Sequence, residues 1–328
     1  MSRRWAERRV LVTGATGVVG GWLVRALLEQ GAYVVALVLD ADPQSALYRS
    51  GDVGHVSVVN GALEDYGTLD RAIATHAVDS VFHLGAQTLV ETAQRAPWLT
   101  FEANIRGTYN LLEACRRHAD RVRRVVVASS DKAYGESSVL PYTEDMPLQG
   151  RHPYEVSKSC ADLLAQSYQH AYGLPVGIAR CGNVYGGGDL HWERIVPGTI
   201  RSLWRGERPV IRSDGTYIRD YLYVEDCVSA YLALGHGLDR AGVAGHAFNF
   251  STESWVPVRE IVATIQKIMR RQDLEPLVQD VAVAEIKSQS LSARKARERL
   301  DWHPAYDLER GLRKTVTWYA NFFGERTA

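Results

Sequence analysis

The sequence predicts an α/β protein with a doubly wound parallel sheet and a smaller C-terminal, substrate-binding lobe. The first observation is a series of apolar runs of strand length, centred near Val10, Val35, Val58, Val81, Val126 and Ile178. The second is that stretches with helical spacing of apolar residues separate these runs, as in strand–helix–strand units. After Cys181 the alternation loosens, and prolines, glycines and aromatic residues become more frequent. We therefore predict two parts, residues 1–180 and 181–328, with some segments of the second returning to the first.

The composition excludes several classes of function. Lysine plus arginine balances aspartate plus glutamate at 38 each in 328 residues, so net charge gives no attraction to nucleic acid. No apolar stretch approaches the roughly 18 residues of a membrane span. The four cysteines show no spacing typical of a metal site and are expected to be reduced, buried thiols. We expect a soluble, cytoplasmic protein without a metal, a membrane contact or a nucleic-acid partner.

The first strand runs into a glycine-rich turn, "VLVTGATGVVGG", with glycines at 14, 17 and 20 before a helix. Such a turn lets the backbone approach a pyrophosphate at a helix N-terminus, which predicts a Rossmann-type dinucleotide site. Asp40 ends the second strand, 20 residues after Gly20, where a carboxylate can bind the adenosine ribose. No basic residue follows until Arg49, which favours NAD over NADP. The alternatives are glycines that serve the turn alone and an Asp40 that caps a loop. The residues expected to contact the cofactor here are Gly14, Thr16, Gly17, Val18, Val19, Gly20 and Asp40.

A second site is predicted where the strand near Val126 ends. Tyr154 and Lys158 lie four residues apart in "YEVSK", on one face of a predicted helix. An ammonium beside a phenol lowers the pKa of the phenol, so Tyr154 can serve as general base. The stretch "VVVASSDKAYGE" adds Ser130, Asp131 and Lys132 at the carboxyl end of its strand, where open parallel sheets bind ligands. Hydride transfer alone needs one base, so the extra acid and base indicate that a further bond is broken. The plain alternative is a surface tyrosine with a solvated lysine.

Seven motifs in order resemble the extended short-chain dehydrogenase/reductase family of nucleotide-sugar epimerases and dehydratases. They are "TGATGVVG", "VFHLGAQ", "ANIRGTYNLLEAC", "SSDKAYG" with "YEVSK", "RCGNVYGGGD", "GTYIRDYLYVEDC" and "LDWHP". The pair Asp131-Lys132 is similar to the CDP-glucose 4,6-dehydratases within this family. The resemblance implies oxidation of the hexose at carbon-4 with Tyr154 as base, loss of water across carbons 5 and 6 with Asp131 as acid, and hydride return to carbon-6. It leaves open whether Lys132 is the base at carbon-5 or a charge that stabilises the enolate.

The resemblance also implies further binding residues. Lys158 would hold the nicotinamide ribose beside Tyr154, and Leu63, Leu84 and Ala86 would line the cofactor site. The residues implied for the substrate are Gln87, Asn104, Asn183, Arg194, Arg219 and Lys287. Asn183 could instead be a turn residue, Arg219 an ion-pair partner of Asp220, and Asn104 a helix cap. The family's usual aspartate near adenine is Ala62 here, so Asp65 or backbone groups would have to contribute.

Two rival functions remain at this point: a 4-epimerase acting on a UDP-sugar, and a non-catalytic NAD-binding regulator. The intact Ser130, Tyr154 and Lys158 argue against the regulator. The family resemblance also implies a homodimer formed by the helices that carry "NIRGTYNLLEAC" and "YEVSKSCADLLAQ". The leucines that could serve this interface, or pack inside the monomer, are Leu111, Leu112, Leu163 and Leu164.

Overall fold

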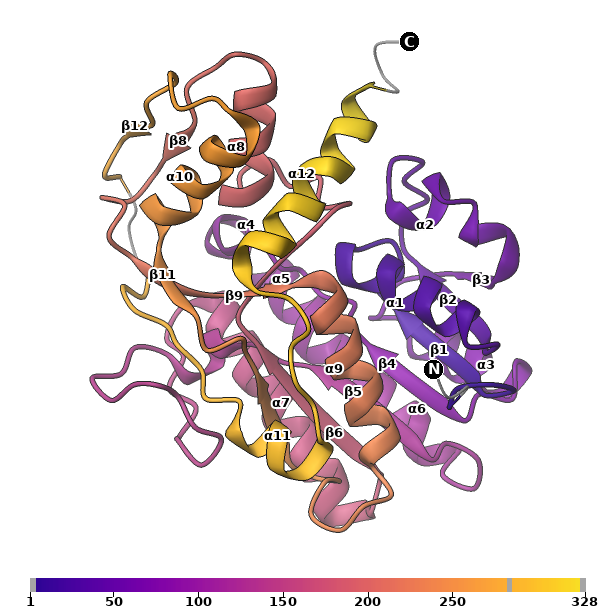
Figure 1. Ribbon diagram of the computed structural model, residues 1–328. Coiled ribbons are helices and arrows are strands. Elements are labelled where there is room, and N and C mark those ends of the chain that lie inside the picture. The colour runs from indigo at the N-terminus through magenta and orange to yellow at the C-terminus, as the bar shows by residue number, and fades with distance from the viewer. Residues whose placement is uncertain (1–3, 282–284, 325–328) are drawn as a thin grey trace.

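The computed structural model describes residues 4–281 and 285–324, and within them the centre is a seven-stranded parallel sheet (Figure 1). Its order is β10-β6-β5-β4-β1-β2-β3, so the strand order reverses between β1 and β4. Open α/β sheets bind ligands beyond the carboxyl ends of the strands at such a reversal. The strands are β1(Arg9–Thr13), β2(Tyr33–Val38), β3(Ser57–Asn60), β4(Ser80–His83), β5(Arg124–Ala128), β6(Val176–Cys181) and β10(Ala247–Phe250).

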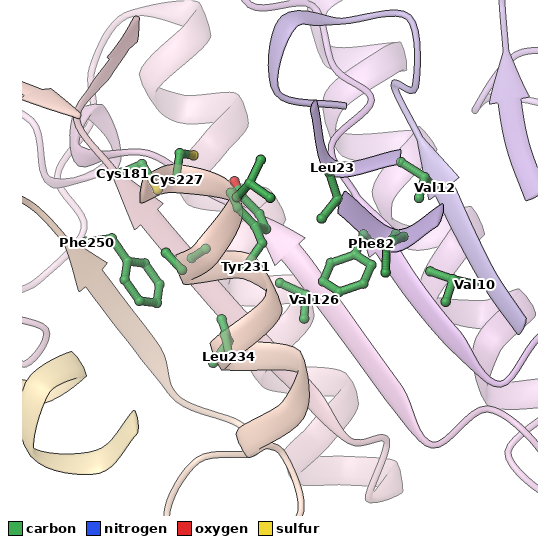
Figure 2. Packing of buried hydrophobic residues seen from close by; sticks show 14 of the residues in the cluster. Val10, Val12, Leu23, Phe82, Val126, Cys181, Cys227, Tyr231, Leu234 and Phe250 are labelled. Carbon is green, nitrogen blue, oxygen red and sulfur yellow. The ribbon is translucent and has the colours of Figure 1, made fainter. Parts of the chain in front are cut away.

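Helices cover both faces of this sheet, which explains why the strands read as continuous apolar runs. One face carries α1(Val18–Glu29), α9(Val224–Gly237) and α11(Arg294–Leu300). The other carries α3(Tyr66–Thr75), α6(Gly107–Arg117) and α7(Pro153–Tyr172). Figure 2 shows the first layer, where Leu23 of α1 and Leu234 of α9 pack with Phe82 and Val126 of the strands. Burying each such side chain contributes about 1.5–3 kcal/mol. This architecture confirms the predicted doubly wound α/β fold.

Short helical segments lie in the connections between the strands. They are α2(Ala46–Arg49), η1(Asp52–His55), α4(Val90–Arg95), α5(Pro97–Phe101), the π-helical turn η2(Glu102–Arg106) and the 3-10 turn η3(Asp131–Tyr134). The π-helical turn runs directly into α6, and π-turns of this kind are frequent at functional sites.

Most of the chain after β6 builds a smaller lobe with its own apolar cluster. Its elements are β7(Asn183–Tyr185), α8(Ile195–Trp204), β8(Val210–Ile211), β9(Ile218–Tyr223), β11(Trp255–Pro257), α10(Val258–Met269), β12(Leu277–Val278) and α12(Leu308–Gly324). Strands β11, β9 and β7 form one small sheet, and β12 pairs with β8. Helix α9 and strand β10 instead lie on the main sheet. The division at residue 180 stays a prediction.

The expectations about membrane spans and about cysteines can be compared with the described residues. In the ranges 4–281 and 285–324, no helix is long and apolar enough to cross a bilayer. All four cysteines are free thiols: Cys115, Cys181 and Cys227 are buried, and Cys160 is half-buried.

Candidate functional site

The turn between β1 and α1 has the geometry of a phosphate cradle. Gly14 has φ of +69°, and a Cβ there would lie 2.7 Å from the backbone nitrogen of Gly85. A Cβ on Gly20 would lie 2.0 Å from the carbonyl oxygen of Gly14. Gly17 precedes the helix without a side-chain cap, and the first turn of α1, which includes Val18 and Val19, has no acidic residue. The helix N-terminus therefore offers backbone N–H groups and a positive dipole end to an anion, which fits the diphosphate of a dinucleotide.

The remaining residues expected at the cofactor lie at the same edge of the sheet. Asp40 is exposed two residues beyond the end of β2. Leu63, Leu84 and Ala86 are half-buried after β3 and β4. Thr16 is half-buried in the glycine turn.

Asp65, expected together with backbone groups to take the place of the missing adenine-binding aspartate, is engaged at the start of a helix. Asp65 is the N-cap of α3, where Oδ1 accepts a bond from Thr68 N at 3.2 Å and Oδ2 accepts one from Thr68 Oγ1 at 2.6 Å. These bonds lower the pKa of Asp65 and hold its carboxylate at the helix. The carboxylate therefore serves the helix start.

Helix α7 carries Tyr154 and Lys158 close to its N-terminus. Pro153 occupies the first turn, and the Glu155 carboxylate accepts backbone bonds from Arg151 at 2.8 Å and His152 at 3.2 Å. Proline and a reciprocal carboxylate are strong helix-start signals, so the local sequence fixes where this helix begins. Lys158 Nζ donates to the carbonyl oxygen of Ala128, the last residue of β5, at 2.9 Å.

The predicted lowering of the Tyr154 pKa by Lys158 is wrong for this structure. Burial and, to a smaller extent, the charge of Asp131 raise the pKa of Tyr154 to about 12. The hydrogen bond with Ser130 and the charge of Arg194 act in the opposite direction. Burial also lowers the pKa of Lys158 to about 8, which weakens its effect as a cation. Desolvation of both groups explains the difference, because the sequence spacing shows proximity and not burial.

The turn η3 brings an acid and an amine together beside this helix. Ser130 caps the turn by accepting from Lys132 N at 3.2 Å, and its hydroxyl donates to Asp131 Oδ1 at 2.9 Å. Lys132 Nζ lies 3.1 Å from Asn183 Oδ1 and 3.6 Å from Asp131 Oδ1. The side chain of Asp131 is 1% exposed, and its Oδ2 has no partner among the described residues. A buried carboxylate oxygen without a partner is costly unless a ligand or water meets it.

Asn104, in the π-helical turn, makes its side-chain bonds within the protein. Its Oδ1 accepts from Gln87 N at 2.7 Å, and its Nδ2 donates to Gln87 O and Ser157 Oγ, both at 2.9 Å. Ser157 in turn donates to the carbonyl oxygen of Tyr154 at 2.7 Å. Asn104 therefore does lie near Tyr154, but in a position that orients Gln87 and helix α7. Gln87 has a buried Oε1 without a partner in the described part of the chain.

The three basic residues expected at the substrate occupy different settings. Arg194 bridges the two lobes, since it donates to Asp189 Oδ2 at 2.9 Å and to Thr88 Oγ1 at 3.0 Å. Arg219 is buried and pairs with Glu285 at 3.1 Å, where the sequence suggested Asp220 as its alternative partner. Lys287 is exposed, and its carbonyl oxygen accepts from Arg219 Nη1 at 3.2 Å.

Several buried polar side-chain atoms have no hydrogen-bond partner among the described residues. Within residues 4–281 and 285–324, these atoms belong to Gln87, Ser129, Asp131, Thr199, Asp220, Tyr221 and Gln289. Each unpaired buried group costs roughly 1–3 kcal/mol, so the unpaired atoms of Gln87, which follows β4, and of Ser129 and Asp131, which follow β5, favour a polar ligand at the carboxyl ends of these strands. The same residue ranges hold no cluster of side chains that fits a metal ion.

Sequence reasoning missed several partners that hold the site. Asp189 holds Arg194, Glu285 holds Arg219, and Ser157 connects Asn104 to Tyr154. The Glu285–Arg219 and Ser157–Asn104 contacts join residues more than 50 positions apart, and no local sequence pattern marks them. The one usable signal is the short "GGGD" segment, whose glycines indicate a tight loop before Asp189.

Comparison with known proteins identifies the lineage of this arrangement. The family model described as GDP-mannose 4,6 dehydratase matches residues 11–315. The chain belongs to this family. A CDP-glucose 4,6-dehydratase of Salmonella typhimurium is 32% identical, with 96% of this chain and 91% of that protein covered. The family assignment confirms the resemblance inferred from the motifs.

Solved structures of proteins with two different activities resemble the chain at similar levels. A dTDP-glucose 4,6-dehydratase of Streptomyces venezuelae, with NAD bound, has a TM-score of 0.87 at 27% identity and covers 97% of this chain and 98% of its own. A UDP-glucose 4-epimerase of Thermotoga maritima, with UDP-glucose, has a TM-score of 0.88 at 29% identity and covers 96% and 99%. Overall shape therefore does not separate dehydratase from epimerase, and the side chains at the site must.

Proposed function

We propose that the protein is an NAD-dependent nucleotide-sugar 4,6-dehydratase that converts CDP-glucose to CDP-4-keto-6-deoxyglucose. The observation that carries the proposal is the Asp131–Lys132 pair, held 3.6 Å apart at the end of β5 beside Tyr154. An epimerase needs one base, whereas elimination of water also needs an acid for the leaving hydroxyl. The CDP-glucose and dTDP-glucose dehydratases among the relatives support this reading.

The cofactor is held by the glycine turn and by residues at the carboxyl ends of the neighbouring strands. Gly14, Gly17 and Gly20 bring backbone N–H groups to the diphosphate, and Asp40 accepts bonds from the adenosine ribose. Lys158 holds the second ribose beside Tyr154. When bound, NAD supplies the hydride acceptor for carbon-4 of the hexose, the hydride donor for carbon-6, and a positive charge that favours the phenolate.

The side chains handle the protons of the reaction. Tyr154 accepts the proton of the 4-hydroxyl as carbon-4 becomes a ketone, and Ser130 orients that hydroxyl. The ketone acidifies the hydrogen on carbon-5, and a water molecule accepts that proton, which leaves an enolate stabilised by Lys132. Asp131 then delivers a proton to the 6-hydroxyl, the bond between carbon-6 and oxygen breaks, and one water leaves. A hydride to carbon-6 and a proton to carbon-5 complete the product, so the oxidation state of the cofactor is restored.

Lys132 acts in this proposal as a charged stabiliser of the enolate. Its Nζ faces two oxygen acceptors, Asn183 Oδ1 at 3.1 Å and Asp131 Oδ1 at 3.6 Å, which hold it beside the reacting carbons. Substitution distinguishes the two roles. Lys132→Arg keeps the charge and cannot act as a base, whereas Lys132→Gln loses both functions. Retained water loss in Lys132→Arg with loss in Lys132→Gln supports the electrostatic role, and loss in both assigns the base.

The nucleotide and diphosphate lie against the smaller lobe. Arg219 and Arg194 supply the positive charge, and Asn183 supplies amide hydrogens. Lys287 is exposed, and its backbone lies beside Arg219; from there its side chain would contact the substrate. Gln87, oriented by Asn104, offers its unpartnered Oε1 to a sugar hydroxyl.

Mass spectrometry of sugar nucleotides after incubation with enzyme and NAD tests the proposal. CDP-glucose, UDP-glucose, dTDP-glucose and GDP-mannose are supplied separately, and loss of one water from CDP-glucose is expected. Asp131→Asn keeps the acceptor for Ser130 but cannot deliver a proton, so water loss should fall by about 10²–10⁴-fold while oxidation at carbon-4 continues. Unchanged water loss in Asp131→Asn contradicts the assigned acid.

The second candidate is a UDP-sugar 4-epimerase, favoured by the likeness to the Thermotoga maritima enzyme. It predicts an isomer of UDP-glucose with unchanged mass and little effect of Asp131→Asn. A non-catalytic NAD-binding regulator predicts no change in any of the four sugar nucleotides.

We also propose that the protein is a homodimer. Leu111 and Leu112 are buried in the core of the monomer, which excludes them from an interface. Leu163 of α7, in contrast, is 55% exposed, and Tyr109 of α6 and Trp98 of α5 are exposed as well. Helices α6 and α7 of two copies can bury these side chains against each other. The four free thiols support a cytoplasmic location.

A further inference from the structure

A buried histidine that the proposed chemistry does not use connects two parts of the site. His83 ends strand β4 and is 3% exposed. Its Nδ1 lies 2.8 Å from Thr13 Oγ1, and its Nε2 lies 3.0 Å from Thr108 Oγ1. Thr13 is the last residue of β1, and Thr108 is in the first turn of α6. The imidazole therefore bridges the strand that enters the glycine turn and a helix on one face of the sheet.

The direction of each hydrogen bond follows from counting protons. Thr108 Oγ1 lies 2.6 Å from the carbonyl oxygen of Asn104, which can only accept, so the single hydroxyl proton of Thr108 is used there. His83 Nε2 must then be the donor to Thr108. Burial lowers the pKa of His83 to about 3, and the charge of Lys158 acts in the same direction, so the ring is neutral. A neutral ring with a proton on Nε2 accepts at Nδ1, and Thr13 is its donor.

Both ends of this bridge continue to residues of the site. Thr13 Oγ1 accepts from the backbone nitrogens of Leu84 at 3.1 Å and Gly85 at 3.0 Å. These bonds fix the loop after β4 against the glycine turn. At the other end, Thr108 holds the backbone of Asn104, whose side chain holds Gln87 and, through Ser157, the carbonyl oxygen of Tyr154. A connected path therefore runs from the cofactor turn to the start of helix α7, through hydrogen bonds and, at Asn104, through the covalent link between its backbone and its side chain.

We propose that His83, as the neutral tautomer protonated on Nε2, is a positioning residue that sets the placement of Tyr154 relative to the cofactor turn. The proposal rests on the function proposed above, because it assigns the reacting groups at both ends of the chain. From the backbone nitrogen of Gly85 to the carbonyl oxygen of Asn104, this tautomer lets every donor meet an acceptor. Removal of one link leaves a buried group unpaired and frees the two ends to shift. A misplacement of about 1 Å between reacting groups costs on the order of 10²-fold in rate.

The first experiment reads the tautomer directly. Histidine rings are labelled with ¹⁵N in the full-length, NAD-loaded protein, and long-range proton–nitrogen spectra distinguish the two neutral tautomers and the imidazolium. The His83→Asn variant identifies the signal by its loss. A proton on Nε2 that persists from about pH 6 to pH 8 is expected, because burial keeps this ring neutral. A proton on Nδ1, or titration in this range, overturns the inference whether or not the enzyme turns over a sugar nucleotide.

The second experiment breaks one link and restores it. Thr108→Val keeps the shape of the side chain and removes the acceptor for His83 Nε2, whereas Thr108→Ser keeps the hydroxyl. In NAD-loaded enzyme, Thr108→Val should lower kcat by about 10–100-fold with KM changed by less than about twofold. The isotope effect of deuterium at carbon-4 should rise, because hydride transfer becomes slower, and Thr108→Ser should behave like the wild type.

Other results of the Thr108→Val experiment distinguish a structural role of these hydrogen bonds from a positioning role in the reaction. If Thr108→Val lowers the Tm but leaves kcat and the isotope effect unchanged well below the Tm, the chain is structural only and the inference is wrong. If the wild-type protein removes water from none of the sugar nucleotides, the proposed function fails, and the tautomer measurement still decides the state of His83.

Discussion

Asp220 of β9 makes the stability of this protein depend on pH in an unusual direction. Its side chain is fully buried, and a single oxygen, Oδ2, accepts both Ser251 Oγ at 2.6 Å and Leu291 N at 3.0 Å. Burial, with a smaller contribution from the charge of Asp131, raises the pKa of Asp220 from 3.8 to about 7. The two hydrogen bonds and the nearby Trp255 indole lower the pKa without offsetting burial. The folded protein therefore holds a proton that the unfolded chain releases.

The sign and size of the effect follow from linkage. Because the folded pKa lies above the unfolded pKa, the contribution of Asp220 to stability is fully present below about pH 3.8 and is lost as pH rises toward 7. A difference of about three pKa units corresponds to about 4 kcal/mol at 1.36 kcal/mol per unit. Between about pH 5.5 and pH 8, the same two pKa values give a loss of about 2 kcal/mol.

Asp220→Asn removes this dependence with little change of shape. The amide oxygen can accept both bonds that Oδ2 accepts, and the amide nitrogen takes the place of Oδ1, which has no hydrogen-bond partner in the described residues. Urea unfolding at about pH 5.5 and pH 8 gives the free energy of unfolding of both proteins. The advantage of the variant over the wild type should grow by about 2 kcal/mol between the two pH values.

Asp65→Asn serves as a control of opposite sign. Hydrogen bonds from Thr68 lower the pKa of Asp65, so its contribution is present above the unfolded pKa and is lost as pH falls through the folded value. Asp65→Asn should therefore be less stable than the wild type at pH 8. The reasoning about Asp220 would be refuted if the free energies of unfolding of the wild type and Asp220→Asn changed equally between the two pH values. It would also be refuted if the stability advantage of the variant became smaller toward pH 8.

Three further substitutions test the site and its support. Gly20→Ala should lose bound NAD, because its Cβ would lie 2.0 Å from the carbonyl oxygen of Gly14. The absorbance of the purified protein measures the bound NAD. The control Gly54→Ala, which has open space around its Cβ, should retain NAD. Asp162→Asn breaks a buried two-bond pair with an arginine of β6 and should lower the free energy of unfolding in urea by about 3–5 kcal/mol; a loss below about 1 kcal/mol contradicts the role of this pair. Leu163→Glu should give monomers in analytical ultracentrifugation, whereas Val139→Glu, at another exposed apolar position, should not; unchanged mass for Leu163→Glu excludes the α6–α7 interface.

The local sequence was sufficient for the fold and for the catalytic motif because both depend on short-range spacing. Apolar runs become parallel strands when helices cover both faces, and glycines at 14, 17 and 20 allow the turn that a Cβ would block. Tyr154 and Lys158 share a helix whose start is marked by Pro153 and Glu155. These features follow from backbone geometry within one turn or one strand.

The tertiary structure decided what surrounds those residues. The direction of the Tyr154 pKa shift depends on burial and on Asp131, and spacing along α7 contains neither. Leu112 and Leu163 look alike in the sequence, yet one is in the core and the other is exposed, because helix packing selects the face that is buried. The bridge from Thr13 through His83 to Thr108 joins strands and helices that are distant in the chain. The sequence by itself determined the elements and their chemistry, whereas their charge states and partners arose from contacts that form only when the sheet and its helices assemble.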